Sequence, residues 1–318
     1  MKTTYDCIPC FIRQALDAAR LTTPDENIHE QVLRGVLAAA SKMNLDQSPP
    51  VMGQYIHKLI RELSGIDDPY KKIKDRFNSF ALELYPDLKQ RIRSSSNPMD
   101  TAIRMAIAGN IIDFGVNAKI DRSIIIDTIE QAMSVQLFGN IDILCDSIDS
   151  AKNILYLGDN CGEIVFDRLL IEQLPVDKVT FVVRGGPIIN DATMADARET
   201  GMTELVNVID NGSNIPGTVL EKCSKEFREC FAHADLIIAK GQGNYETLSE
   251  VDKDIFFLLK AKCPVVARDI GCHVGALVLR RSNMSMANHT NNVGDGFIRG
   301  RDGCTQEAAR DTAAASDA

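Results

Sequence analysis

The fold is decided by residues 153–163, which read Asn-Ile-Leu-Tyr-Leu-Gly-Asp-Asn-Cys-Gly-Glu. Residues 153–157 form a short apolar run typical of a strand, and the apolar residues of 164–174 recur with helical spacing. Asp159 and Asn160 therefore stand where a strand ends and a helix begins, which is the place where open α/β sheets bind their ligands. A carboxylate beside an amide at this point indicates a metal ion rather than a bare anion.

The same alternation continues to about residue 280. The apolar, β-branched runs that we interpret as strands are 153–157, 178–183, 205–209, 236–239 and 264–267, and helical stretches separate them. Repeated strand-helix units predict a mostly parallel, Rossmann-like sheet. Residues 149–280 are therefore expected to form an α/β domain.

The residues before this domain have helical spacing almost throughout. The expected helices are 9–20, 24–43, 51–63, 69–84, 98–114 and 122–137, and prolines near several of their starts suit a first helical turn. No strand is predicted in this part. We expect residues 1–148 to form an all-α region and the polar residues 281–318 to form a disordered tail.

The composition restricts the class of protein. The chain has 318 residues, 45% of them hydrophobic, and a formal net charge of -9, which argues against nucleic acid as the main partner. No apolar run is long enough for a membrane span and no signal peptide is visible, so we expect a cytoplasmic protein without a membrane partner. Nine cysteines, an odd number spread over a long chain, indicate reduced thiols. The sequence does not determine the oligomeric state.

Polar residues follow each of the first four expected strands. The sets are Asp159, Asn160 and Glu163; Arg184, Asn190 and Asp191; Asp210 and Asn211; and residues 240–244. Because the carboxyl ends of parallel strands share one edge of a sheet, we expect these side chains to lie close together. A single Asp-Asn pair is more typical of a helix cap. Two such pairs at neighbouring strand ends suit Mg²⁺ or Mn²⁺, which prefer oxygen ligands.

Two glycines accompany the lysine that follows the fourth of these strands. In the segment Lys240-Gly241-Gln242-Gly243-Asn244, the glycines can bring backbone N–H groups close to an oxyanion, and Lys240 adds a point charge. A flexible turn with a solvated lysine is an equally good interpretation. The spacing matches neither a P-loop nor a dinucleotide-binding fingerprint, so a nicotinamide cofactor gets little support.

A Cys-x-x-Cys pair, Cys7 and Cys10, opens the first expected helix. A redox role would need a preceding strand, and a zinc site would need two more ligands, for which only the distant Cys272 and His273 are candidates. A thiol pair without a chemical role is the simplest interpretation. No histidine pair has metalloprotease spacing and no Gly-x-Ser-x-Gly elbow is present, so zinc and serine hydrolases are not expected.

Three of these segments resemble one family, in the same order. Residues 158–163, 184–193 and 240–248 are similar to the motifs of the DUF89 proteins, which are also called damage-control phosphatases or the ARMT1-like metal-binding domain family. The Cys-x-x-Cys pair and residues 106–115 resemble its smaller prokaryotic and archaeal branch. The likeness covers residues 2–280, and the tail after Arg280 departs from it.

The resemblance implies a helical N-terminal region in two small parts, packed on an α/β catalytic domain that binds one divalent metal ion, Mg²⁺, Mn²⁺, Co²⁺ or Ni²⁺. By motif position, the metal ligands would be Asp159, Asn160 and Asp191. The implied reaction is the hydrolysis of phosphate monoesters of small metabolites, such as sugar phosphates or damaged phosphometabolites. The ion would polarise a phosphoryl oxygen and lower the pKa of water.

The remaining residues of the expected site would bind the substrate or assist the reaction. Asp159, Glu163 and Lys240 are the expected catalytic residues. Lys240 would bind phosphate oxygens, and Glu163 would either anchor its loop or assist a proton transfer. The nucleophile is either water or Asp159. The expected substrate-binding residues include backbone N–H donors and two residues from the helical region; they are Cys161, Gly162, Arg184, Gly241, Gly243, Asn244, Asn110 and Asp113.

Other functions stay open. A carboxyl methyltransferase that uses S-adenosylmethionine would bind that cofactor without a metal ion. A non-catalytic phosphometabolite-binding protein would bind the same ligands without consuming them. A thiol redox protein would depend on Cys7 and Cys10.

Overall fold

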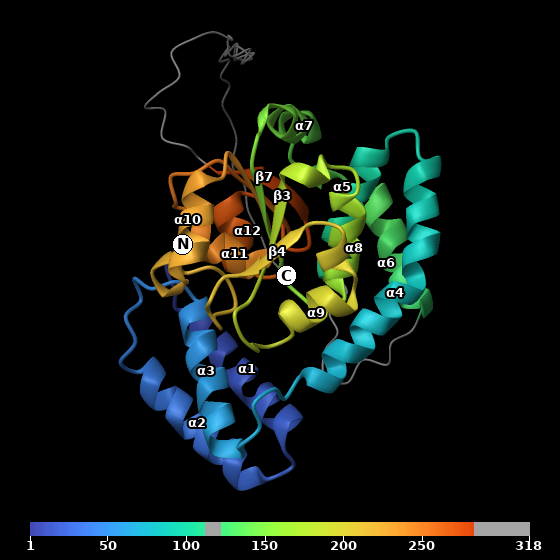
Figure 1. Ribbon diagram of the computed structural model, residues 1–318. Helices are drawn as coiled ribbons and strands as arrows, with labels where there is room; N and C mark the ends of the chain where they lie inside the picture. Colours follow the sequence, from blue (N-terminus) through green and yellow to red (C-terminus); the bar gives the residue numbers. More distant parts are fainter. Residues whose placement is uncertain (112–121, 283–318) are drawn as a thin grey trace, which may run out of the picture. The chain divides into compact units, whose positions relative to one another are not determined.

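Helices fill the N-terminal region of the computed structural model, which describes residues 1–111 and 122–282 (Figure 1). They are α1 (Cys7–Thr22), α2 (Glu26–Ala40), α3 (Pro50–Ser64), α4 (Lys71–Ser94), α5 (Pro98–Ile111), α6 (Arg122–Ser134) and α7 (Ile141–Ser150). Local sequence explains several of their ends. The Asp25 carboxylate accepts the Asn27 backbone N–H at the start of α2, and Gly65 takes a left-handed φ of 69° directly after α3.

One sheet organises the rest of the described chain. Its strands are β1 (Leu137–Phe138), β2 (Ile154–Leu157), β3 (Val179–Val183), β4 (Asn207–Asp210), β5 (Leu236–Lys240), β6 (Ile255–Lys260) and β7 (Leu277–Arg281). They are joined by α8 (Glu163–Ile171), α9 (Met194–Glu199), α10 (Lys225–His233), α11 (Gly241–Leu248), α12 (Pro264–Ile270) and the short 3-10 helices η1 (Val176–Lys178), η2 (Met202–Glu204) and η3 (Leu220–Lys222).

The strand order is β1-β7-β6-β5-β2-β3-β4. Strands β2 to β6 run parallel to one another, β7 is antiparallel to β6, and β1 is parallel to β7. A mostly parallel sheet behind an all-helical region confirms the predicted fold class.

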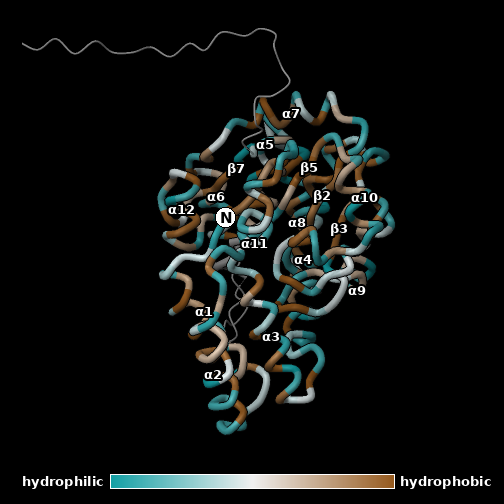
Figure 2. The backbone as a smooth tube through the Cα atoms, turned by 90° about the vertical axis from the view of Figure 1, so that its left-hand side faces the viewer, coloured by the Kyte–Doolittle hydropathy of each residue, from teal (hydrophilic) through white to brown (hydrophobic). Residues whose placement is uncertain are grey.

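Side chains that alternate along each strand pack into two different cores. Ile154 and Tyr156 of β2 pack with α4, α5 and α8, whereas Leu155 and Leu157 pack with α10, α11 and α12. Figure 1 shows α10–α12 on one side of the sheet and α5 and α8 on the other, and Figure 2 shows the hydrophobic β2 and β3 between helices. Burial on both faces explains why β2 is a continuous apolar run.

Helices α1–α3 have a hydrophobic core of their own, to which Phe11, Val36 and Ile56 belong. Helix α3 also contacts the carboxyl edge of the sheet, because Gln54 Nε2 donates a hydrogen bond to Asn214 Oδ1, beyond the end of β4, at 2.7 Å. This helical part therefore lies beside the loops that follow the strands.

Near the end of the sheet, one expected strand is wrong and one strand was not predicted. Residues 264–267 begin helix α12 instead of forming a strand, because Cys263 Sγ accepts the Val266 backbone N–H at 3.5 Å and Pro264 suits the first turn. The strand in this part is β6, an apolar run at residues 255–260 that the sequence analysis does not predict. Short apolar runs are compatible with either a strand or a buried helix, which explains both differences.

Other boundaries also differ. Helix α4 continues through Pro86 to Ser94 instead of ending near residue 84, because Leu88 and Ile92 extend its buried face. Strand β1 occupies the end of the expected helix 122–137, and β7 reaches Arg281, the first residue of the expected tail.

Residues Met1–Met284 form one compact unit, and the domain boundary expected between residues 148 and 149 stays a prediction. Residues 283–318, which make up nearly all of the expected tail, and Asp113 lie outside the described residues. None of the helices in residues 1–111 and 122–282 combines the length and the apolar character that a membrane span requires.

Candidate functional site

The loops after β2 and β3 are bonded to each other at the carboxyl edge of the sheet. The Ala192 N–H donates to the Asp159 carbonyl oxygen at 2.8 Å, and a short antiparallel bridge pairs Asn160 with Asp191. These bonds place the three expected metal ligands on adjacent backbone segments.

The turn that presents Asp191 is strained. Ile189 has a φ of 44°, a left-handed conformation that a β-branched residue rarely adopts. The Asp191 N–H donates to the Ile188 carbonyl at 3.0 Å and closes the turn. Backbone strain of this kind concentrates at functional sites, where the surrounding structure maintains it.

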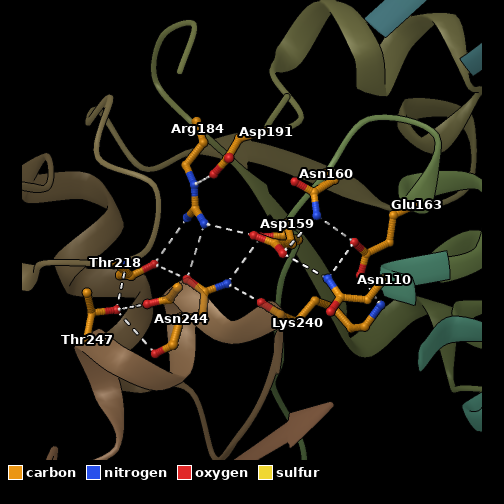
Figure 3. Close-up of polar contacts among 12 residues, drawn as sticks. Asn110, Asp159, Asn160, Glu163, Arg184, Asp191, Thr218, Lys240, Asn244 and Thr247 are labelled. Carbon is orange, nitrogen blue, oxygen red and sulfur yellow. Dashed lines mark hydrogen bonds and ion pairs between the residues drawn. The ribbon is translucent and has the colours of Figure 1, made fainter. Parts of the chain in front are cut away.

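Each of the three side chains keeps one oxygen that accepts no hydrogen bond within the part of the chain that the structure describes. Asn110 and Asn160 donate from Nδ2 to Asp159 Oδ2 at 3.1 and 2.9 Å. Arg184 donates from Nε to Asp191 Oδ2 at 2.7 Å. The Oδ1 atoms of Asp159, Asn160 and Asp191 accept no hydrogen bond from the described residues, although Arg184 Nη2 lies 3.7 Å from Asp159 Oδ1 in an ion pair (Figure 3). Two carboxylate oxygens and one amide oxygen suit a hard divalent cation.

The pKa values of the Asp159 and Asp191 carboxyl groups are both raised. The pKa of Asp159 lies well above its usual range because of burial and the negative charges of Glu163 and Asp191. The charges of Arg184 and Lys262 oppose this rise in the pKa. Burial also raises the pKa of Asp191, against the effect of the Arg184 guanidinium. A further positive charge between these carboxylates would therefore be favourable.

A buried ion-pair network lies behind Asp159. Lys240 Nζ donates to Glu163 Oε1 at 2.7 Å, to Asp167 Oδ1 at 2.5 Å and to the Ala106 carbonyl at 2.8 Å. All three charged side chains are fully buried. Although burial lowers the pKa of Lys240, Asp167 and Glu163 raise it above its usual value, so the ammonium stays charged.

The structure corrects the role expected for Lys240. Its three ammonium hydrogens already meet three buried acceptors, and the side chain has no exposed surface. No donor remains for a phosphate oxygen. Lys240 instead binds Glu163 inside the protein. Burial alone would raise the pKa of Glu163, but the charge of Lys240 and the hydrogen bonds to Glu163 lower this pKa below its usual value.

Glu163 orients two amide side chains. Its Oε2 atom accepts from Nδ2 of Asn110 at 3.0 Å and from Nδ2 of Asn160 at 2.9 Å. Because both nitrogens face Glu163 and Asp159, the Asn160 oxygen points to the other side, toward Asp191 (Figure 3). Asn110 comes from α5, so the helical region contributes directly to the site, as expected.

The expected turn after β5 is the first turn of helix α11. Gly241 has a φ of 78°, and a Cβ atom built on it would lie 1.8 Å from Asp159 Oδ2. Only glycine therefore allows this close approach of backbone and carboxylate. The N–H groups of residues 241–243 have no acceptor inside the helix, because a first turn never does. Helix α11 thus directs three N–H donors toward the carboxyl edge.

Arg184 connects the two sides of the site. In addition to Asp191, it donates to Thr218 Oγ1 at 3.3 Å and to Asn244 Oδ1 at 3.4 Å, and it lies 3.7 Å from Asp159 Oδ1. Thr218 Oγ1 donates to Asn244 Oδ1 at 2.8 Å. Asn244 is therefore fully engaged inside the protein, and its side chain supports Arg184.

The backbone N–H groups expected to bind phosphate after β2 are already used. The Cys161 N–H donates to the Asn190 carbonyl at 2.8 Å, and the Gly162 N–H donates to Asn78 Oδ1 at 2.7 Å. The Glu163 N–H also has an acceptor within its own loop. This loop therefore presents side chains to the site, and the expectation that its N–H groups bind substrate is corrected.

Several residues of the site were missed by the sequence analysis. Lys262 follows β6, which was not predicted, so its place at the carboxyl edge had no signal. Asn78 and Asp167 lie inside helices, where a polar residue on an apolar face is the only visible sign. Asp210 and Asn211 do not join the expected metal ligands. Asp210 Oδ1 accepts the Gly212 N–H, and Asn211 Oδ1 accepts the N–H groups of Ser213 and of Gly185, the residue after Arg184.

The eight described cysteines do not belong to a cluster that could hold a metal ion. No three His, Cys, Asp or Glu side chains of residues 1–111 and 122–282 are grouped to hold a metal ion. Eight cysteines within these residues, Cys7 and Cys10 among them, are free thiols. The Asp-Asn-Asp set at the carboxyl edge is a different arrangement, because one of its three ligands is an amide.

The fold is that of an α/β protein with a mostly parallel sheet, a class in which ligands commonly bind where the strands end. Residues 3–278 match the damage-control phosphatase ARMT1-like domain. An uncharacterized protein of Methanocaldococcus jannaschii, MJ0202, is 40% identical over 88% of the chain and 95% of its own length. The damage-control phosphatase PH1575 of Pyrococcus horikoshii is 36% identical over 90% of the chain and its full length.

A solved structure agrees with these sequence matches. The crystal structure of the DUF89 family protein PH1575 has a TM-score of 0.82, with 36% identity over 89% of this chain and 100% of that chain. A damage-control phosphatase of Archaeoglobus fulgidus is 36% identical over 88% of the chain and 99% of its own length.

The chain belongs to the damage-control phosphatase ARMT1-like domain family, also known as DUF89. The resemblance predicted from three motifs is confirmed. The names of the relatives support the predicted class of function, a phosphatase.

Proposed function

We propose that this protein is a metal-dependent phosphatase that hydrolyses phosphate monoesters of small metabolites, such as sugar phosphates or damaged phosphometabolites. One observation carries the proposal. Three side-chain oxygens from two bonded loops, on Asp159, Asn160 and Asp191, are left without hydrogen bonds from other described residues at the carboxyl edge of the sheet. The relatives named as damage-control phosphatases support the same reaction class.

Asp159, Asn160 and Asp191 would hold one divalent cation, for which Mg²⁺, Mn²⁺, Co²⁺ and Ni²⁺ are the candidates. When bound, the cation supplies the charge that polarises a phosphoryl oxygen and acidifies a water molecule. The hard oxygen donors favour Mg²⁺ and Mn²⁺. The remaining work of the site is positioning, since phosphoryl transfer depends mainly on alignment and charge neutralisation.

The phosphate group would be bound by the first turn of α11 and by Lys262. The N–H groups of residues 241–243 form a helix N-terminus, which favours anions. Lys262 is exposed and has no ion pair with another described residue, and its charge acts on Asp159. We therefore assign to Lys262 the phosphate contact that the sequence analysis gave to Lys240.

Glu163 and Lys240 would act by positioning. Glu163 holds the amides of Asn110 and Asn160, and Lys240 neutralises Glu163 in a fully buried place. Arg184 fixes one oxygen of Asp191 and leaves the other for the cation. Such outer contacts determine the orientation of metal ligands.

The protein is expected to act in the cytoplasm. The free thiols of the eight described cysteines support a reducing compartment.

The decisive experiment is a phosphate-release screen across sugar phosphates, with and without Mg²⁺, Mn²⁺, Co²⁺ and Ni²⁺. We expect hydrolysis only with a divalent ion, and Asp159→Asn should abolish it while the protein stays folded by circular dichroism. Binding of a phosphometabolite without release of phosphate would instead support a sensor. Methyl transfer from S-adenosylmethionine without metal would support the methyltransferase alternative. Unchanged turnover by Asp159→Asn would refute the ligand assignment.

A further inference from the structure

Asn78 is a fully buried polar residue in the middle of helix α4. Asparagine is unfavourable inside a helix, and a buried amide costs free energy unless its hydrogen bonds are made. Here they are made to Gly162, in the loop after β2, and to Asp196 and Glu199 of α9, the helix that follows the Asp191 turn. The packing of α4 alone does not explain why an asparagine is buried at this position.

The oxygen of Asn78 holds the loop after β2. Its Oδ1 atom accepts the backbone N–H of Gly162 at 2.7 Å. Gly162 is the residue before α8, has a φ of 69° and lies two positions after Asn160. The bond therefore fixes the backbone immediately beyond the ligand pair Asp159 and Asn160.

The nitrogen of Asn78 holds the segment after β3. Its Nδ2 atom donates to Asp196 Oδ1 at 2.9 Å and to Glu199 Oε2 at 2.8 Å. Asp196 in turn accepts the backbone N–H and the hydroxyl of Thr193 at 2.8 and 2.7 Å. Thr193 lies two positions after Asp191, so the bond reaches the third ligand through a capping interaction.

Lys74 strengthens the same contact from one helical turn earlier. Its Nζ atom lies 3.0 Å from Asp196 Oδ2, and both side chains are buried. Burial raises the pKa of Asp196, but Lys74 and the Thr193 hydrogen bonds lower it overall, so Asp196 stays ionised and accepts from Asn78. Residues 74 and 78 lie on one face of α4, four positions apart.

We propose that Asn78 is a positioning residue that sets the spacing of the two ligand loops and thereby the affinity of the site for a divalent cation. The inference rests on the proposed metal-dependent function. Only asparagine offers one acceptor to a backbone N–H and two amide hydrogens to two carboxylates in so short a side chain. Aspartate would turn an oxygen toward Asp196 and Glu199, and alanine would leave the Gly162 N–H without its partner.

The test measures Mn²⁺ binding to the purified protein by isothermal titration calorimetry, independently of activity. Asn78→Ala should weaken the Mn²⁺ Kd about 10-fold to 100-fold, the range typical of residues that orient metal ligands. At saturating Mn²⁺, kcat should recover toward the wild-type value, because the ligands themselves are intact. Asn78→Asp keeps the shape of the side chain and should weaken Mn²⁺ at least as much, which covers the case in which Asn78→Ala does not fold.

Leu88→Ala is the matched control. Leu88 lies on the same helix, is buried in the core and makes no hydrogen bond to either loop. This variant should lower the thermal midpoint but leave the Mn²⁺ Kd within about twofold of wild type, because cavity formation destabilises without moving the ligands.

Each outcome decides the inference. Asn78 variants with a wild-type Mn²⁺ Kd would overturn it, and so would a Leu88→Ala variant that loses as much affinity as Asn78→Ala. A wild-type protein that binds Mn²⁺ but hydrolyses no phosphate monoester would overturn the proposed function alone. A wild-type protein that binds no Mn²⁺ would overturn both.

Discussion

Replacing Gly241 by alanine should disable the site and destabilise the fold. The new Cβ atom would lie 1.8 Å from Asp159 Oδ2, so the carboxylate must retreat by about 1.6 Å to reach ordinary van der Waals contact at 3.4 Å. Asn110 and Asn160 hold this oxygen at 3.1 and 2.9 Å. The retreat therefore breaks or stretches two hydrogen bonds to a charged group, each worth about 1.5–3 kcal/mol.

Activity and stability are both expected to fall, and they are measured separately. A displacement of about 1 Å in a catalytic group can cost about 100-fold in rate, so kcat/KM of Gly241→Ala should fall at least 100-fold with Mn²⁺ present. The positive φ of 78° adds strain of about 1–2 kcal/mol for a residue with a Cβ atom. Phosphate release measures the first effect, and urea unfolding measures the second.

Gly271→Ala is a control that introduces the backbone strain of a positive φ without a steric clash. Gly271 has a φ of 83°, close to that of Gly241, but a Cβ atom there would meet nothing within 4 Å. This variant should lose about 1–2 kcal/mol of stability and keep its activity. If Gly241→Ala retained activity within about threefold of Gly271→Ala, the close packing of Gly241 against a functional carboxylate would be refuted.

Three further predictions concern the charges of the site. Lys240→Met should destabilise the fold by about 3–5 kcal/mol in urea unfolding, because it leaves the Glu163 and Asp167 carboxylates buried without their cation. Adding Asp167→Asn to this variant should restore part of the lost stability. Equal stability of the single and double variants would contradict the ion-pair network. Burial raises the pKa of the Asp167 carboxyl group from 3.8 to about 6 in the folded protein, so protonation of Asp167 stabilises the folded state relative to the unfolded state. This stabilisation is fully present below about pH 4 and is lost as the pH rises to about 6. Relative to Asp167→Asn, the wild type should therefore lose about 3 kcal/mol over this interval, and parallel stability curves would refute the assignment. Lys262→Ala should raise KM for a phosphorylated substrate about 10-fold with kcat nearly unchanged, whereas Lys152→Ala, at the amino end of β2, should change neither.

The sheet could be predicted from the sequence wherever a strand is bounded by clear turn signals. Strands β2, β3 and β5 combine a short apolar run with a following glycine-containing or acidic segment, and their positions were predicted within a residue or two. Strand β6 and helix α12 were confused, because both are short, apolar and buried. The choice between them depends on the cap that Cys263 makes to α12, and such a cap is visible only in three dimensions.

The convergence of the three expected metal ligands was predictable from the sequence, but the residues that support them were not. Asp159, Asn160 and Asp191 follow neighbouring strands, so topology alone brings them together. The role of Lys240 could not be read from the sequence, because its acceptors Asp167 and Ala106 are distant in the chain or hidden in helices. The same holds for Asn78, whose three hydrogen-bond partners are 84, 118 and 121 residues away.

The balance of charge explains why these supports matter together. Four carboxylates and two cationic side chains form one contiguous buried set: Asp159, Glu163, Asp167, Asp191, Arg184 and Lys240. Its formal charge is -2 when every group is ionised, and buried charge without compensation is costly. Lys240 offsets one charge of the inner pair, Glu163 and Asp167, and Arg184 offsets one charge of the outer pair, Asp159 and Asp191, so one negative charge is left on each pair. Burial is the main cause that raises the pKa values of Asp159, Asp167 and Asp191. A divalent cation at the Oδ1 atoms of Asp159 and Asp191 would bring the formal charge of the set to zero, which supports the proposal of a metal ion at this edge of the sheet.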